Sequence, residues 1–90
     1  MTKVITIGVT APAPALVPTL ARPGENIKVL NLDPTTETTI RIYTADGILQ
    51  GTYSAYGEET FVIRAASDNG FYLVEVSNDS MKSTLRYIVK

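Results

Sequence analysis

Histidine and cysteine, the side chains that most often act as bases, nucleophiles and zinc ligands, are both absent from this 90-residue chain. Their absence excludes a disulfide framework, a thiolate or imidazole metal site, a cysteine nucleophile and a Ser-His triad. The side chains left for acid-base or nucleophilic chemistry are mainly carboxylates and hydroxyls, and their spacing decides what they can do.

Carboxylates and hydroxyls gather in three short polar stretches, none of which has the spacing of a site. Glu58 and Glu59 are adjacent, so in a strand their carboxylates point to opposite faces and cannot share an acid-base task. Residues 68–70 resemble part of a calcium loop, but no glutamate follows at the required spacing. The hydroxyls of residues 35–39 have no neighbouring base to activate them. The sequence therefore predicts no catalytic residue, no metal site and no cofactor, and we expect a protein that is not an enzyme.

Composition and charge indicate one small globular domain without an obvious polyanionic partner. The net charge is −1, from 8 basic and 9 acidic residues that are interspersed. No basic stripe is present to follow a phosphate backbone, so we expect no nucleic-acid partner. No apolar run approaches the roughly 20 residues that span a bilayer. Residues 1–9 alternate as a strand does rather than as a signal peptide, so we expect any export signal upstream, in a longer protein of which this chain is the C-terminal part.

Seven segments have the alternation and the β-branched or aromatic residues that are typical of strands. They are residues 4–9, 26–32, 38–45, 48–53, 60–65, 71–77 and 81–89. Their alternation predicts which side chains share a face. Ile40 and Ile42, and likewise Phe61, Ile63 and Ala65, are expected to face the core. In residues 26–32, Ile27, Val29 and Asn31 share one face and Lys28, Leu30 and Leu32 the other; in residues 71–77, Tyr72, Val74 and Val76 share one face.

Turn signals separate these segments. Asp33-Pro34, Tyr56-Gly57, residues 67–70 and residues 78–80 combine the residue types that turns prefer. Asp46-Gly47 is the strongest signal and predicts a type I′ hairpin between residues 38–45 and 48–53.

The segment from residue 10 to residue 24 carries Pro12, Pro14, Pro18 and Pro23. Proline fixes φ and donates no backbone hydrogen bond, so neither a helix nor a central strand is expected there. We interpret the segment as an ordered crossover between two sheets; the alternative is a flexible tether, with the folded part beginning near Arg22. The chain is accordingly divided into residues 1–22, an N-terminal strand and proline-rich connection, and residues 23–90.

Short strands at this spacing predict an all-β sandwich or a small barrel, and the long connection favours the sandwich. Exposed tyrosines on such a sheet would offer a platform for protein or carbohydrate. The chain has five: Tyr43, Tyr53, Tyr56, Tyr72 and Tyr87.

The second half of the chain resembles the C-terminal sorting domain of the type IX (Por) secretion system of Bacteroidetes. The resemblance covers roughly residues 23–90. Its motifs are Ile27-Lys28-Val29, then Ile40-Arg41-Ile42-Tyr43 with Gly47, then residues 70–76, and finally Lys82 with Ile88-Val89-Lys90. The family usually has an acidic residue where Thr44 stands and a basic one where Ile48 stands, and Arg22-Pro23-Gly24-Glu25 replaces its Asn-Pro.

This resemblance implies an immunoglobulin-like sandwich of about seven antiparallel strands that directs an exported protein across the outer membrane to the cell surface. The implied partner is the secretion translocon or the surface-anchoring machinery. The candidate sorting-motif residues are Ile42, Tyr43, Gly47, Gly70, Tyr72, Val74, Lys82 and Lys90. The alternative is an immunoglobulin-like structural or adhesive module of a surface protein that binds protein or glycan. The oligomeric state stays open.

Overall fold

The protein is all-β. The computed structural model describes residues 13–79 and 81–90, and this part of the chain contains eight strands and no helix. None of its segments is therefore a helix able to cross a membrane. The strands are β1 (Ala15–Val17), β2 (Leu20–Ala21), β3 (Asn26–Leu30), β4 (Thr38–Thr44), β5 (Leu49–Ala55), β6 (Phe61–Arg64), β7 (Gly70–Ser77) and β8 (Lys82–Val89).

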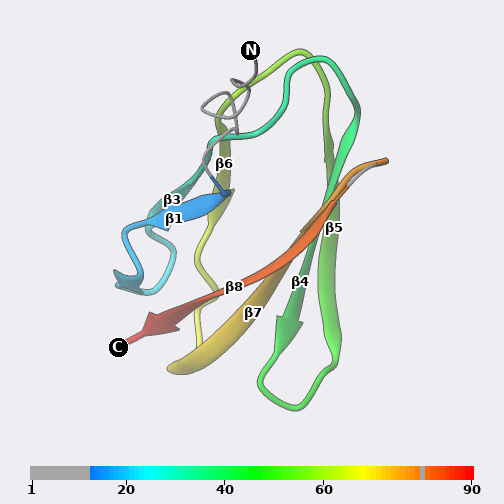
Figure 1. The fold of residues 1–90 in the computed structure, drawn as a ribbon. Coiled ribbons are helices and arrows are strands. Elements are labelled where there is room, and N and C mark those ends of the chain that lie inside the picture. The colour runs from blue at the N-terminus through cyan, green and yellow to red at the C-terminus, as the bar shows by residue number, and fades with distance from the viewer. Residues whose placement is uncertain (1–12, 80) are drawn as a thin grey trace, which may run out of the picture.

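The strands form two sheets that face each other, as in a β-sandwich (Figure 1). One sheet has three strands in the order β1-β3-β6, and the other has five in the order β2-β8-β7-β4-β5. All pairs are antiparallel except β2 with β8, which is parallel. The predicted all-β class is thus confirmed, while the expectation of antiparallel strands only is wrong for this one pair.

Side chains from the inner faces of both sheets form a single hydrophobic core. Strand alternation explains its membership, because every second residue points inward. The core positions predicted on residues 38–45 are confirmed, and the face shared by Tyr72, Val74 and Val76 is buried in the core. On residues 60–65 Phe61 is only half-buried, while the other two predicted residues are buried. The core residues are Leu16, Ala21, Ile27, Val29, Leu32, Ile40, Ile42, Ala55, Ile63, Ala65, Tyr72, Val74, Val76, Tyr87 and Val89.

The prediction for the end of β3 was wrong at two residues. Asn31 is exposed and Leu32 is buried, the reverse of the predicted faces. Asn31 has a left-handed backbone (φ +66°), which ends the strand and reverses the alternation. Its side-chain amide donates a hydrogen bond to the Ala13 carbonyl (3.1 Å), and the Leu32 N–H donates to the Glu59 carbonyl (2.9 Å).

The proline-rich segment crosses between the two sheets, as expected for residues 15–21. β1 pairs with β3, and after Pro18 the chain joins the other sheet as β2 beside β8. Leu16 and Ala21 are buried, so these residues are not a tether. The sequence did not predict these two strands, because proline disfavours strands. Both are the terminal strands of their sheets, where a proline next to them removes no ladder bond. The strand expected at residues 4–9 lies outside the described residues.

The hairpin between β4 and β5 forms where it was predicted, but its turn is not type I′. Gly47 alone has a positive φ in this turn (+87°), whereas type I′ requires two such residues. The Gly47 N–H donates to the Thr44 carbonyl (2.9 Å), and the Ile48 N–H donates to Thr44 Oγ1 (3.1 Å). The Thr44 N–H donates to the Ile48 carbonyl (2.8 Å), which closes a three-residue loop. A separate bulge follows in β5, because the register shifts between Ile42 and Tyr43 and leaves Gln50 without an opposite residue on β4.

Candidate functional site

The side of the five-stranded sheet that faces away from the core, here called the outer face, is the candidate site. Its side chains alternate along each strand with the buried ones. Strand register therefore shows which of them are neighbours. Across β8, β7 and β4, Arg86 lies beside Leu73 and Leu73 beside Tyr43. One row further along, Thr84, Glu75 and Arg41 lie side by side.

The half of the outer face nearest the end of β8 is mainly apolar, with Arg86 beside Leu73. Leu20, Ile88 and Phe71 are adjacent by register on β2, β8 and β7, and their side chains are 59%, 41% and 45% exposed. Leu73 and Tyr43 continue the apolar surface towards Leu49 on β5. An antiparallel sheet normally places polar residues on its solvated face. Contiguous exposed apolar side chains on such a face are typical of an interaction surface.

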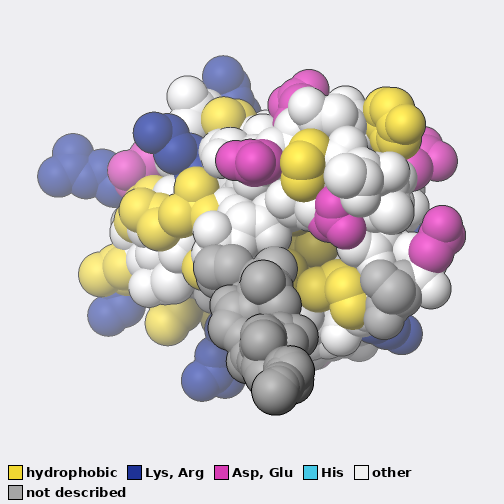
Figure 2. All heavy atoms as spheres, turned by 45° about the horizontal axis from the view of Figure 1, so that its top comes forward, with side chains coloured by type: hydrophobic (Ala, Val, Ile, Leu, Met, Phe, Trp, Pro, Cys, Tyr) yellow, Lys and Arg dark blue, Asp and Glu magenta, His cyan; other side chains and the backbone are white. Residues whose placement is uncertain are grey.

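Two cations without a carboxylate partner in the described residues, Arg86 and Lys90, border this apolar half. With Thr19, Leu20 and Ile88 they line a shallow hollow of about 470 Å³. Figure 2 shows one face of the molecule, on which exposed hydrophobic side chains lie close to basic and acidic ones. The surface thus combines apolar contact area with positive charge.

The other half of the outer face is polar and has an ion-pair network centred on Glu75. Its carboxylate lies 3.1 Å from Lys82 Nζ and 3.3 Å from Arg41 Nη1. Lys82, followed by Arg41, lowers the pKa of Glu75 despite the opposing effect of its partial burial. The carboxylate therefore stays charged and holds Lys82 against the sheet.

The sorting-motif residues do not form one site. Ile42, Tyr72 and Val74 are buried in the core, and Gly47 and Gly70 lie at turns with positive φ. Tyr43 and Lys82 are on the outer face, and Lys90 is exposed at the end of β8, where its N–H donates to the Ala21 carbonyl (3.0 Å). Tyr43, Lys82 and Lys90 are thus the candidates whose side chains a partner could contact, since the two exposed glycines have none.

Tyr72 has a specific structural role at the start of β7. Its hydroxyl donates to the Asp68 carbonyl (2.8 Å), and its ring stacks on that of Tyr87 with centroids 5.3 Å apart. The Tyr87 hydroxyl accepts the Ala66 N–H (3.3 Å), and burial raises the pKa of Tyr87. Together the two tyrosines attach the connection between β6 and β7 to the core.

The five tyrosines do not share a platform. Tyr43 is on the outer face, whereas Tyr53 lies on the opposite face of the sheet with its ring 5.9 Å from that of Phe61. Tyr56 is exposed in the loop after β5, and the remaining two are buried. A stacking surface built from several tyrosines is therefore not available.

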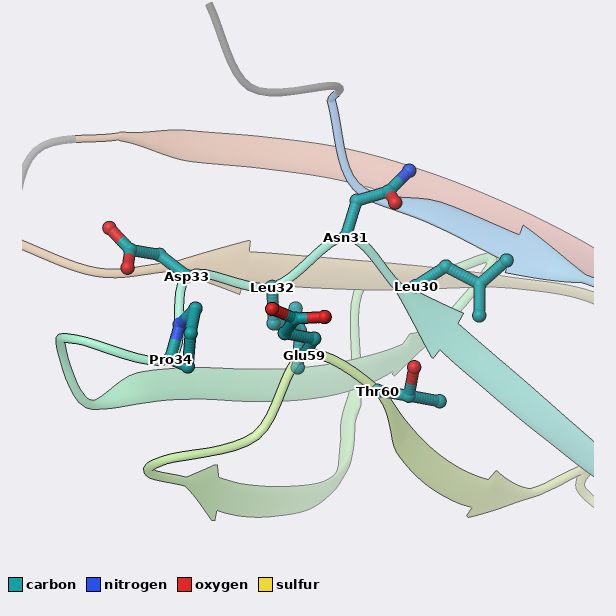
Figure 3. A pocket seen from close by; sticks show the side chains of 7 residues that line it. All are labelled: Leu30, Asn31, Leu32, Asp33, Pro34, Glu59 and Thr60. Carbon is teal, nitrogen blue, oxygen red and sulfur yellow. The ribbon is translucent and has the colours of Figure 1, made fainter. Parts of the chain in front are cut away.

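The loops at one end of the sandwich enclose a second hollow, of about 470 Å³, between Leu30–Pro34 and Glu59–Thr60 (Figure 3). Its two carboxylates belong to Asp33 and Glu59. Asp33 accepts hydrogen bonds from the Thr35 hydroxyl (2.6 Å) and the Thr35 N–H (2.9 Å), which lower its pKa. These bonds close the predicted turn. No group of three potential metal ligands occurs in the part of the chain that the structure describes.

The sequence reasoning missed the apolar half of the outer face. Alternation predicts Leu49, Phe71, Leu73 and Ile88 only as strand residues, and Leu20 only as part of the proline-rich connection. A signal was present in residues 71–74, where Phe71 and Leu73 alternate with Tyr72 and Val74. A strand that is apolar on both faces is expected to be covered on both faces.

No protein-family model matches this chain, and no curated protein is significantly similar to it in sequence. The resemblance to sorting domains therefore depends on the motif residues alone.

Proposed function

We propose that this chain is a non-enzymatic sorting or anchoring domain of the type IX secretion kind, which directs an exported protein to the cell surface. The observation that carries the proposal is the adjacency of three motif strands. β4, β7 and β8 are neighbours in the five-stranded sheet, although β4 and β7 are separated by two other strands in the sequence. Tyr43 and Lys82, from the first and last of these motifs, share the outer face. Motifs that are distant in sequence would then act together on one surface.

We further propose that the sandwich is immunoglobulin-like. Strands lettered A, B and E in that fold correspond in order to β1-β3-β6, and G, F, C and C′ to β8-β7-β4-β5. The bond from the Tyr72 hydroxyl to the Asp68 carbonyl supports this, since immunoglobulin-like domains have a tyrosine corner near the start of strand F. β2 would be the part of strand A that moves to the second sheet.

Thr44 and Ile48 differ from the residues usual in the sorting-domain family, and both are compatible with this proposal. Thr44 Oγ1 accepts the Ile48 N–H, which an aspartate carboxylate at the same position would also do. Ile48 is exposed in the hairpin loop, so the missing positive charge alters the surface rather than the fold. The loop geometry required by the motif is therefore retained with a neutral acceptor.

The surface that the machinery would read is the apolar half of the outer face together with Arg86 and Lys90. A matching partner presents apolar side chains with carboxylates at their border. Such a partner belongs to the translocon or the anchoring machinery, and neither a nucleic acid nor a cofactor is required.

The test is export of a reporter fused ahead of residues 13–90 in a type IX-competent bacterium and in its translocon mutant. Under the proposal, the reporter reaches the surface or medium in the first strain only. Ile88→Lys on the outer face abolishes this export, whereas the matched exposed change Val62→Lys on β6 does not. Both variants must fold in vitro. A wild-type fusion that stays periplasmic in both strains contradicts the proposal.

A second candidate function is an adhesive or spacer module of a surface protein. It is favoured by the extent of the apolar surface, which continues onto β4 and β5 beyond the last hairpin. In that case the reporter is not exported by this chain, and Ile88→Lys weakens adhesion of an independently displayed module instead.

A further inference from the structure

We propose that β5 is a pairing edge for a second copy of this chain, and that two copies join antiparallel into one continuous ten-stranded sheet. The structural basis is the position of β5. It is the last strand of the five-stranded sheet, so among the described strands β4 alone pairs with it, and it lies at the border of the molecule in Figure 1. Its other side therefore presents backbone N–H and C=O groups along seven residues.

The other terminal strands of the described sheets are poor pairing edges. β1 has three residues, β2 has two, and β6 has four and ends at Arg64. Short strands and charged residues are the usual means by which proteins protect sheet edges. β5 has neither protection. Leu49–Ala55 contains no charged residue and no proline, and a bulge at its start is the only irregularity in its pairing with β4.

A second copy fits this edge better than another partner because antiparallel strand pairing is two-fold symmetric. The backbone groups of β5 in one copy then pair with those of β5 in the other, and the assembly closes at two chains. A two-fold axis at Thr52, the middle residue of β5, places Gly51 opposite Tyr53 of the other copy. The Tyr53 ring already covers its own Gly51, with ring atoms 3.4 Å from where a Cβ would be. In the pair, each ring would also contact the partner's glycine, a favourable cross-strand arrangement.

Within residues 13–79 and 81–90, no segment covers this edge. Residues 49, 50, 52, 53 and 54 are all exposed, on both faces of the strand. The apolar side chains of Leu49 and Tyr53 would be partly removed from water by the partner strand. Because one strand pair buries less than a standard interface, the dimer should be weak, with a dissociation constant on the order of 10–100 μM.

The proposal is tested by sedimentation equilibrium of residues 1–90 between about 5 μM and 1 mM, with circular dichroism to verify folding. We expect a reversible monomer–dimer equilibrium. Thr52→Lys places two like charges opposite each other at the axis, and the dissociation constant should rise at least about tenfold. Val62→Lys, an exposed change on the edge strand β6, should leave it unchanged.

A single cysteine provides a second, independent test, because the chain has none of its own. Directly opposite residues of an antiparallel pair have Cα atoms within reach of a disulfide. Thr52→Cys should therefore form a covalent dimer on mild oxidation at low protein concentration, and Val62→Cys should not. A wild-type chain that is monomeric at 1 mM overturns the proposal. So does a dimer that Val62→Lys disrupts while Thr52→Lys leaves it intact, or equal cross-linking of the two cysteine variants.

Discussion

Replacing Tyr72 by phenylalanine tests whether this motif residue holds the fold together. The change removes one oxygen atom, whose hydrogen bond to the Asp68 carbonyl is 2.8 Å long. The ring remains, and with it the stacking on Tyr87. The result is therefore a measure of the hydrogen bond and not of a cavity.

The size of the effect follows from the two groups that lose their partner. A hydrogen bond within a protein contributes about 0.5–1.5 kcal/mol to stability after its exchange with water is counted. The Tyr72 side chain is buried, but Asp68 is exposed, so water can reach part of the carbonyl left behind. We therefore expect Tyr72→Phe to lower the free energy of unfolding by about 1 kcal/mol, and Tm by about 4–8 °C.

The assay is thermal and urea unfolding followed by circular dichroism. Tyr43→Phe is the matched control, because it makes the same chemical change on the outer face, where the hydroxyl has no partner among the described residues. That variant should stay within about 0.5 kcal/mol of the wild type. If the two variants have the same stability, the corner between β6 and β7 does not depend on this bond, and the argument for Tyr72 is refuted.

Three further changes address a buried hydroxyl, a glycine and the ion-pair network. Thr38 Oγ1 is buried and has no hydrogen-bond partner in the described part of the chain, so Thr38→Val should stabilise the protein by about 1 kcal/mol in urea unfolding; destabilisation would indicate a bound water. Gly70 has φ +140°, where a side chain is strained, so Gly70→Ala should cost about 1–3 kcal/mol although no atom obstructs a Cβ; an unchanged Tm would contradict this. Lys82 and Arg41 lower the pKa of Glu75 below its ordinary value of 4.5, so the charged carboxylate contributes stability above about pH 4.5 and loses it as the pH falls through the lowered pKa. Wild type should therefore exceed Glu75→Gln in stability at pH 7 and converge with it in acid; a constant difference across that range would exclude the ion pairs as the cause.

The strands that alternate clearly could be predicted from the sequence, and those that depend on tertiary contacts could not. Residues 38–45 and 71–77 have β-branched and aromatic residues at every second position, which is sufficient to place Ile40 and Val74 in the core. β1 and β2 are too short to alternate, and they exist because β3 and β8 offer free edges beside the prolines. Asn31 reverses the alternation through its own backbone angle, which composition does not reveal. The apolar half of the outer face likewise depends on register, since Leu20 and Ile88 become neighbours only when β2 joins β8.

The positions of the candidate motif residues in the fold decide whether a match to the motif indicates a fold or a function. Ile42, Tyr72 and Val74 would be required by almost any sandwich with this sheet, and Gly47 and Gly70 are required by its turns. A match at these five positions is evidence for a fold and only indirectly for a function. A translocon that recognises the folded domain has to read accessible side chains, and among the motif residues these belong to Tyr43, Lys82 and Lys90.

Recognition and folding can therefore be separated by substitution. Lys82→Gln removes a surface charge from the outer face and leaves Glu75 with Arg41 as its partner, so the domain should remain folded. If export of the fused reporter falls while Tm changes by no more than a few degrees, the charge is read by the machinery. If export follows Tm across Lys82→Gln, Tyr72→Phe and Gly70→Ala alike, these three residues act by securing the fold, and the groups that are read have to be sought at Tyr43, Lys90 and the apolar half of the outer face.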